Sequence, residues 1–134
     1  MTLIELIRRA KRVYIIGNGG SYANAAHIAT DLLACGIKAY TLDAATLTAF
    51  GNDHGYETVF ARWLETVGEE GDLLIALSGS GTSPNILKAC AAADRIGMKV
   101  WREFGAAQGL NMQQAEEAQL VLGHKLREAL CTKR

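Results

Sequence analysis

Short apolar runs alternate with longer amphipathic segments along the chain. Continuous runs of β-forming residues at 13–16 and 72–77 predict strands that are buried on both faces. Shorter apolar stretches at 38–42 and 98–101 predict two more strands. The segment 56–67 carries apolar residues at helical spacing, which predicts an amphipathic helix. Strands that alternate with helices in this way favour right-handed crossovers and a parallel sheet.

The remaining pattern completes an α/β architecture. Further helices are expected at 2–12, 22–34, 84–96 and 113–130, while 44–51 is ambiguous and 104–112 looks like a loop. We therefore predict a three-layer α/β/α fold with a four- to five-stranded parallel sheet. The chain has 134 residues and contains neither a repeat nor a linker, so we expect a single domain over 1–134.

The amino-acid composition limits the kinds of binding partner that the protein can have. The 14 basic and 14 acidic residues cancel, which provides no electrostatic footprint for nucleic acid or an anionic membrane. No apolar run reaches the ~18 residues that a membrane span needs, and no signal peptide is recognisable, so we expect a cytoplasmic protein. Cys35, Cys90 and Cys131 are odd in number and form no C-x-x-C pair. We expect reduced thiols that serve in packing.

Two loops rich in Ser and Gly follow two of the predicted strands. They are Gly-Asn-Gly-Gly-Ser at 17–21 and Ser-Gly-Ser-Gly-Thr-Ser at 78–83. In an open parallel sheet, ligands bind beyond the carboxyl ends of the strands. Backbone N–H groups, hydroxyls and the N-terminus of the following helix together suit a phosphate. Ser83 as N-cap and Pro84 at the first helical position fix where the second helix begins. We expect both loops to converge on one anion.

The first loop also has a reading as a dinucleotide fingerprint. Gly17-x-Gly19 follows a strand, and Asp43 lies near the end of the next one. Tyr22 stands where the third glycine of that fingerprint would be, and its bulk opposes close packing of helix on strand. A nicotinamide-dependent oxidoreductase remains an alternative on this pattern.

Four motifs occur together. They are Ile-Gly-Asn-Gly-Gly-Ser at 16–21 followed by Ala25-x-His27, Asn-Asp-His-Gly-Tyr at 52–56, Glu-Gly-Asp-Leu-Leu at 70–74, and Ser-Gly-Ser-Gly-Thr-Ser-x-Asn at 78–85. This combination resembles the SIS (sugar isomerase) domain family, and within it the sedoheptulose-7-phosphate (phosphoheptose) isomerases. The similarity is nearly continuous over 13–100. It implies the SIS form of the flavodoxin-like, nucleotide-binding-type fold.

The resemblance also implies an activity. Members of the family are aldose–ketose isomerases, a class of intramolecular oxidoreductase, and work through an enediol. The expected reaction converts sedoheptulose 7-phosphate into D-glycero-D-manno-heptose 7-phosphate, a step of carbohydrate metabolism that serves lipopolysaccharide biosynthesis. Many members bind zinc. They are typically homotetramers with sites at subunit interfaces, so a tetramer or dimer is expected here.

The resemblance assigns roles to individual positions. The expected substrate contacts are Asn18, Gly19, Gly20, Ser21, Asn52, Asp53, Ser78, Gly79, Ser80, Ser83 and Glu116. Of these, the residues expected to hold the phosphate are Ser21, Ser78, Gly79, Ser80 and Ser83.

A metal and acid–base set is implied as well. The family places a His and a Glu on the early helix and a Gln and a His on the last helix around zinc. Here His27 and His124 match, Asp31 replaces the Glu, and Glu116 replaces the Gln. His27 and Asp31 are four apart on one helix and share a face. The resemblance further implies Asp31 as the base and His124 as its acid–base partner.

The chain departs from the family after residue 100. Relatives carry another strand there, whereas here 101–112 leads almost directly to the last helix. We expect the open edge strand to be covered by Trp101 and Phe104 or by another subunit. The shorter side chain of Asp31 and this shortened part favour a non-catalytic SIS module that binds phosphosugar and regulates or scaffolds a protein partner, as relatives do for replication initiator protein. His124 favours the enzyme.

Overall fold

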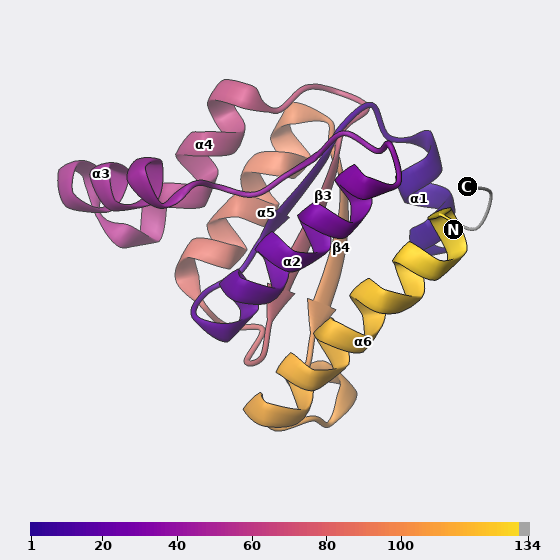
Figure 1. The fold of residues 1–134 in the computed structure, drawn as a ribbon. Helices are drawn as coiled ribbons and strands as arrows, with labels where there is room; N and C mark the ends of the chain where they lie inside the picture. Colours follow the sequence, from indigo (N-terminus) through magenta and orange to yellow (C-terminus); the bar gives the residue numbers. More distant parts are fainter. Residues whose placement is uncertain (132–134) are drawn as a thin grey trace.

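The computed structural model describes residues 1–131 (Figure 1). Its elements in chain order are α1 (Leu3–Arg9), β1 (Val13–Ile16), α2 (Gly20–Ala34), β2 (Ala39–Tyr40), α3 (Ala44–His54), the 3₁₀ turn η1 (Tyr56–Thr58), α4 (Val59–Val67), β3 (Leu73–Ser78), α5 (Pro84–Ile96), β4 (Lys99–Phe104), the 3₁₀ turn η2 (Ala106–Gln108) and α6 (Met112–Cys131).

All four strands are parallel and follow the order β2-β1-β3-β4. Val13 of β1 lies opposite Leu73 of β3, and Leu73 lies opposite Lys99 of β4. This confirms the predicted parallel sheet with four strands. From β1 the chain moves to one side to form β2, and then crosses to the other side to form β3. A crevice opens at the carboxyl ends of β1 and β3 in a sheet with such a reversal.

Two apolar clusters cover the two faces of the sheet. Alternate residues of β1 divide between them: Val13 and Ile15 pack with α1, α2 and α6, whereas Tyr14 and Ile16 pack with α4 and α5. Helix α3 lies beside α4 at the periphery and contains no buried residue (Figure 1). The arrangement confirms the three-layer α/β/α prediction.

Helices α2 and α6 lie side by side on one face and run in the same direction (Figure 1). Their side-chain and backbone contacts join residues 92 to 98 apart in sequence. From the start of α2, the partners are Ser21 and Asn24 with Gln119, Asp31 with Arg127, and Cys35 with Cys131. The packing of α6 on α2 thus places the polar residues of these two helices next to each other.

The expectation of three reduced thiols was wrong for two of them. Cys35 and Cys131 form a disulfide with Cα atoms 4.9 Å apart, inside the usual range for such a bond. They are 96 residues apart, so only the packing of α6 on α2 brings them together. Cys90 is free and buried, as a packing residue would be, and burial raises the pKa of its thiol.

Strand β4 forms the outer edge of the sheet. Within residues 1–131, no strand pairs with its outer side. Trp101 and Phe104 belong to β4 itself and pack partly against the apolar clusters on the two faces of the sheet, so the covering of the open edge that was expected of them stays a prediction. Charged Lys99 and Arg102 along the same strand discourage pairing with another chain. No helix in the described part is long and apolar enough to cross a membrane.

Candidate functional site

The two loops rich in Ser and Gly meet where the chain reverses between β1 and β3. With the start of α6 they enclose a cavity of about 40 Å³, which we call the notch. Its lining residues are Asn18, Ser21, Leu77, Ser78, Gly79, Ser80, Ser83 and Met112. The space exceeds the ~10–15 Å³ that one water needs. The structure therefore brings the two predicted segments together. Phosphate binding by them stays a prediction.

The first loop ends in a glycine conformation. Gly19 is the N-cap of α2 and has a φ of 56°, a backbone geometry that favours glycine. Helix α2 then begins at Gly20, and the N–H of Ser21 donates to the carbonyl oxygen of Asn18 at 2.9 Å. Ser21 lines the notch, and its Oγ accepts a 3.0 Å bond from Nε2 of Gln119. Its own hydroxyl hydrogen stays available for a ligand.

Serines shape the second loop. Ser78 Oγ accepts from the backbone N–H of Gly81 at 2.9 Å, and Ser80 Oγ accepts from that of Thr82 at 3.2 Å. Ser83 occupies the N-cap of α5 as predicted, but within residues 1–131 its hydroxyl makes no capping bond. The first two hydroxyls therefore fold the loop, while the Ser83 hydroxyl is left for a ligand at the notch.

A wider cavity of about 300 Å³ adjoins the notch and shares Asn18 and Ser83 with it. Asn18 and Asn85 exchange two amide hydrogen bonds of 2.9 Å, and the Tyr56 hydroxyl donates to Asn18 Oδ1 at 2.6 Å. These bonds fix the Asn18 side chain between the two cavities. Sequence reasoning gave Asn85 and Tyr56 no role, because their partner lies far away in the chain.

Two predicted substrate contacts lie elsewhere. Asn52 and Asp53 are exposed at the end of α3 and bond to each other at 3.0 Å. Neither lines the notch or the wider cavity. The structure of this chain therefore does not bring them to the phosphate loops.

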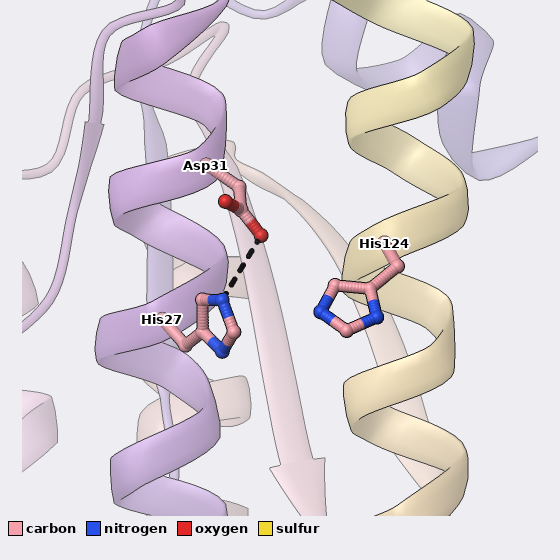
Figure 2. A group of neighbouring side chains, drawn as sticks. All are labelled: His27, Asp31 and His124. Carbon is pink, nitrogen blue, oxygen red and sulfur yellow. Dashed lines mark ion pairs between the residues drawn. The ribbon is translucent and has the colours of Figure 1, made fainter.

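Three of the four expected metal ligands form a cluster between α2 and α6. The ligand atoms of His27, Asp31 and His124 all lie within 4.8 Å of one another (Figure 2). Asp31 is buried, whereas both imidazoles are exposed. His27 Nε2 lies 3.4 Å from Asp31 Oδ2, and the two imidazole rings meet edge to face with centroids 5.4 Å apart.

The cluster fits a zinc ion by its donor set. Two imidazoles and one carboxylate are a known ligand set for catalytic zinc with one open position. Asp31 Oδ2 is buried and has no hydrogen-bond partner among residues 1–131, which leaves an uncompensated acceptor aimed at the rings. Zinc–nitrogen bonds of about 2.0–2.1 Å imply ligand atoms closer together than 4.8 Å. Binding would therefore draw the exposed rings inward.

Glu116, the fourth expected ligand, lies outside the cluster. Its carboxylate lies over Gly20, where a Cβ would overlap with it. Glu116 and His124 are eight residues apart on one helix, a rise of about 12 Å. The expectation that both ligate one ion does not fit this arrangement, because sharing a helix face does not bring residues two turns apart together. Glu116 instead lies at the phosphate loop, where the resemblance also implied a substrate contact.

Comparison with known proteins shows to which family the chain is related. The sequence profile of the SIS domain matches residues 2–101. A phosphoheptose isomerase of Akkermansia muciniphila is 41% identical over 120 residues, which cover 84% of this chain and 64% of the relative. One from Campylobacter concisus is 39% identical and covers 89% and 67%, respectively. The chain thus spans roughly two thirds of the length of these curated relatives.

Solved structures agree. The phosphoheptose isomerase from Neisseria gonorrhoeae matches with a TM-score of 0.86 and 26% identity, covering 97% of this chain and 81% of that one. The enzyme from Francisella tularensis matches with a TM-score of 0.85 and 29% identity, covering 98% and 81%. The whole described fold therefore has counterparts in these two proteins.

Proposed function

Because this chain belongs to the SIS-domain family, we propose that it binds a sugar phosphate and interconverts its ketose and aldose forms. The proposed reaction converts sedoheptulose 7-phosphate into D-glycero-D-manno-heptose 7-phosphate through an enediol. The observation that carries the proposal is the convergence of the two loops on the notch, beside a cluster of titratable groups on the same pair of helices. The phosphoheptose isomerases among its relatives support this substrate.

The phosphate end of the substrate belongs at the notch. The hydroxyls of Ser21 and Ser83 are donors at the notch, and an anion at a helix N-terminus is favoured by the helix dipole. Asn18 is held rigidly at the border of the wider cavity. This arrangement supports a polar chain that continues from the phosphate.

The reacting end belongs at the cluster. Gly20 and His27 are seven residues apart on α2, which corresponds to an axial distance of about 10 Å. A seven-carbon sugar with phosphate at one end and carbonyl at the other also keeps its two functional ends well apart, so one end can lie at the notch while the other lies at the cluster. The spacing therefore supports an extended sugar phosphate rather than a short one.

Proton transfer is assigned to Asp31 and His124. Isomerisation needs one group to remove a proton from carbon and another to move protons between the two oxygens. Asp31 Oδ2 accepts no hydrogen bond within residues 1–131, so it is available as a base. The exposed imidazole of His124, within 4.8 Å of it, suits the second role.

We also propose, as a separate use of the same atoms, that His27, Asp31 and His124 hold zinc; the ligand atoms of Asp31 and His124 would then not be free to move protons. When bound there, zinc would supply Lewis-acid polarisation of a substrate oxygen. The experiment is elemental analysis of the purified protein, followed by the same analysis of His27→Ala. Zinc absent from the wild type after growth with added zinc would end this proposal.

The assembly and location expected from the family stay proposals as well. Exposed Leu33, Leu120 and Val121 lie on α2 and α6 and support contact with further copies of the chain, as in a homotetramer. Light scattering after size exclusion tests this. A cytoplasmic location, and a role in supplying heptose for lipopolysaccharide, are tested by fractionation and by the sugar content of a deletion strain. Disulfides are uncommon in the cytosol, so fractionation needs thiol trapping.

Turnover of the proposed substrate is the decisive test. Purified protein is incubated with sedoheptulose 7-phosphate, with and without a chelator, and the aldose product is measured. Aldose formation by wild type, with loss in Asp31→Asn, supports the isomerase. Binding without turnover would support the second candidate, a phosphosugar-binding module. The engagement of Asp31 by Arg127 at 2.8 Å favours this alternative, because the carboxylate oxygen that accepts this bond is not free to take a proton from a substrate carbon.

A further inference from the structure

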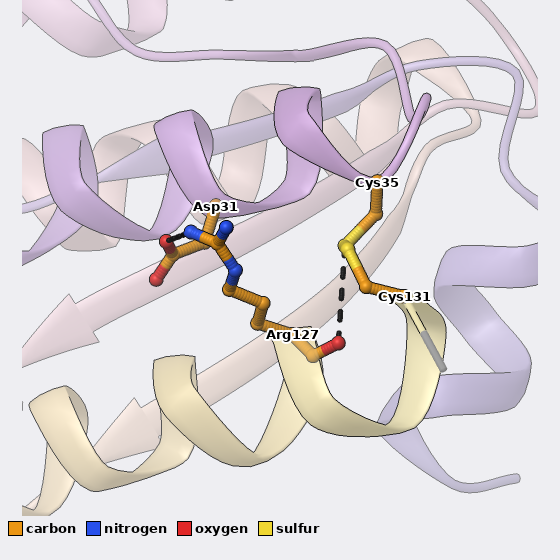
Figure 3. The surroundings of a disulfide bond; sticks show 4 residues. All are labelled: Asp31, Cys35, Arg127 and Cys131. Carbon is orange, nitrogen blue, oxygen red and sulfur yellow. Dashed lines mark hydrogen bonds and ion pairs between the residues drawn. A yellow bond between two sulfur atoms is a disulfide. The ribbon is translucent and has the colours of Figure 1, made fainter. Parts of the chain in front are cut away.

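Arg127 on α6 bonds to the buried carboxylate of the cluster. Its Nη1 donates to Asp31 Oδ1 at 2.8 Å (Figure 3). The Asp31 side chain is 5% exposed and that of Arg127 is 51% exposed. The arginine therefore reaches from the surface to a carboxylate that other described groups leave half unpaired.

The two oxygens of Asp31 have different surroundings. Oδ1 is occupied by Arg127, whereas Oδ2 lies 3.4 Å from Nε2 of His27 and, within residues 1–131, accepts no hydrogen bond. The terminal torsion of an aspartate is broad and roughly two-fold, so packing alone fixes it poorly. A charge-assisted bond to Oδ1 fixes the plane of the carboxylate and thereby directs Oδ2 toward the imidazoles (Figure 2).

The disulfide lies one helical turn beyond this pair on both helices. Cys35 follows Asp31 by four residues, and Cys131 follows Arg127 by four. Sγ of Cys35 also lies 3.8 Å from the carbonyl oxygen of Arg127 (Figure 3). Helix ends fray, and Arg127 lies in the last described turns of α6. The disulfide to Cys35 therefore fixes the described end of α6 to α2 one helical turn from Arg127.

We propose that Arg127 is a positioning residue that fixes the orientation of Asp31, and that the Cys35–Cys131 bond holds Arg127 in place. The consequence for metal and substrate rests on the function proposed above. Partners that hydrogen-bond a ligating carboxylate typically contribute about 10–100-fold to metal affinity or activity. The Cys35–Cys131 bond can be broken by reduction. Two molecules of a small thiol are oxidised to one disulfide, and Cys35 and Cys131 each gain a hydrogen atom.

The first experiment measures Co²⁺ affinity by absorption titration. Arg127→Met keeps much of the apolar stem and removes the guanidinium. Lys125→Met removes an exposed cation from the same helix and is the matched control. Arg127→Met is expected to bind Co²⁺ about 10–100-fold more weakly than wild type, and Lys125→Met equally well. Equal affinity in Arg127→Met and wild type would overturn the proposal.

The second experiment separates positioning from general damage. In Arg127→Ala, kcat with sedoheptulose 7-phosphate is expected to fall while KM changes little, because the phosphate contacts are intact. Added guanidinium at millimolar concentration is expected to restore part of kcat and of Co²⁺ affinity. A lower melting temperature without any rescue would assign Arg127 a structural role only.

The third experiment tests the disulfide. Wild type is reduced with a thiol, desalted without oxygen and titrated again, beside Cys35→Ser/Cys131→Ser. Reduction is expected to lower the Co²⁺ affinity of wild type to that of the double variant. Unchanged affinity after reduction would overturn the role of the disulfide, while a loss in Arg127→Met would still support Arg127.

Failure of the zinc proposal can be distinguished from failure of the positioning role of Arg127. If wild type binds no Co²⁺, the zinc site is refuted, and crystal structures of wild type and Arg127→Met decide the positioning role. A changed Asp31 carboxylate in the variant supports it. The same Asp31 conformation in both would overturn it.

Discussion

Gly123 of α6 lies directly against Ile28 of α2, and a Cβ at this glycine would fall 2.8 Å from Cγ1 of Ile28. Contacts that short do not persist, so the two helices can approach this closely only because position 123 has no side chain. The same approach brings His124 toward His27 and Asp31. The spacing of the cluster thus depends on a single missing methyl group.

Gly123→Ala is expected to destabilise the protein by about 1 kcal/mol. Alanine gains about 0.8–1.0 kcal/mol over glycine in a helix interior, whereas overpacking costs about 1–3 kcal/mol. Urea unfolding measures the sum. In an Ile28→Ala background the clash is absent, so there the same substitution should stabilise. A destabilisation of equal size in both backgrounds would show that Ile28 is not the cause.

Glu116→Gln is expected to raise the affinity for inorganic phosphate and for sedoheptulose 7-phosphate by up to about tenfold, or about 1.4 kcal/mol. The Glu116 carboxylate lies over Gly20 at the start of α2, where it competes with an anionic ligand and repels it. Calorimetry measures the change, and Glu117→Gln, an exposed neighbour, is the control. Unchanged or weaker binding in Glu116→Gln would place the phosphate elsewhere.

Ser83→Ala is expected to lower phosphate affinity about tenfold or more, because a hydrogen bond to a charged ligand contributes about 1.5–3 kcal/mol. Its hydroxyl makes no capping bond in the described structure, so the melting temperature should hardly change. Asp43→Ala removes a real cap bond of 3.1 Å from the Thr46 N–H and should lower the melting temperature without affecting phosphate affinity. The opposite pattern would make Ser83 a helix cap rather than a ligand.

Helix α3 is expected to loosen in acid. Hydrogen bonding from Thr46, by its side chain and then its backbone N–H, lowers the pKa of Asp43 below its ordinary value. A carboxylate with a lowered folded-state pKa contributes stability that is present above its unfolded value, near 3.9, and is lost as pH falls through the folded value. NMR chemical shifts over 44–54 between pH 6 and 3 measure this. In Asp43→Asn, where the cap cannot titrate, this local change should be absent.

Local rules accounted for the sheet and the phosphate loops. The apolar runs of β1 and β3 are buried on both faces because they are the central strands, and Pro84 fixes the start of α5 as expected. Helix α3 was ambiguous because it buries no residue completely; its Leu47 and Phe50 pack only partly against the core. Strand β4 extends past residue 101 to Phe104, since pairing with β3 outweighs its charged composition.

The cluster was less accessible to sequence reasoning. His27 and Asp31 share a helix face at a spacing of four, so their proximity follows from local geometry. Arg127 and Cys131 meet their partners across 96 residues, through a contact between two parallel helices that no local pattern encodes. Their place in the fold depends on how α6 returns to α2 after β4, and only the assembled structure fixes that path.

The Cys35–Cys131 bond closes a covalent ring that contains most of the domain, including the peripheral α3. A protease that cuts once between these cysteines therefore cannot release a fragment while the bond is intact. On a denaturing gel the nicked protein would migrate as one species, and it would separate into two only after a reducing agent is added.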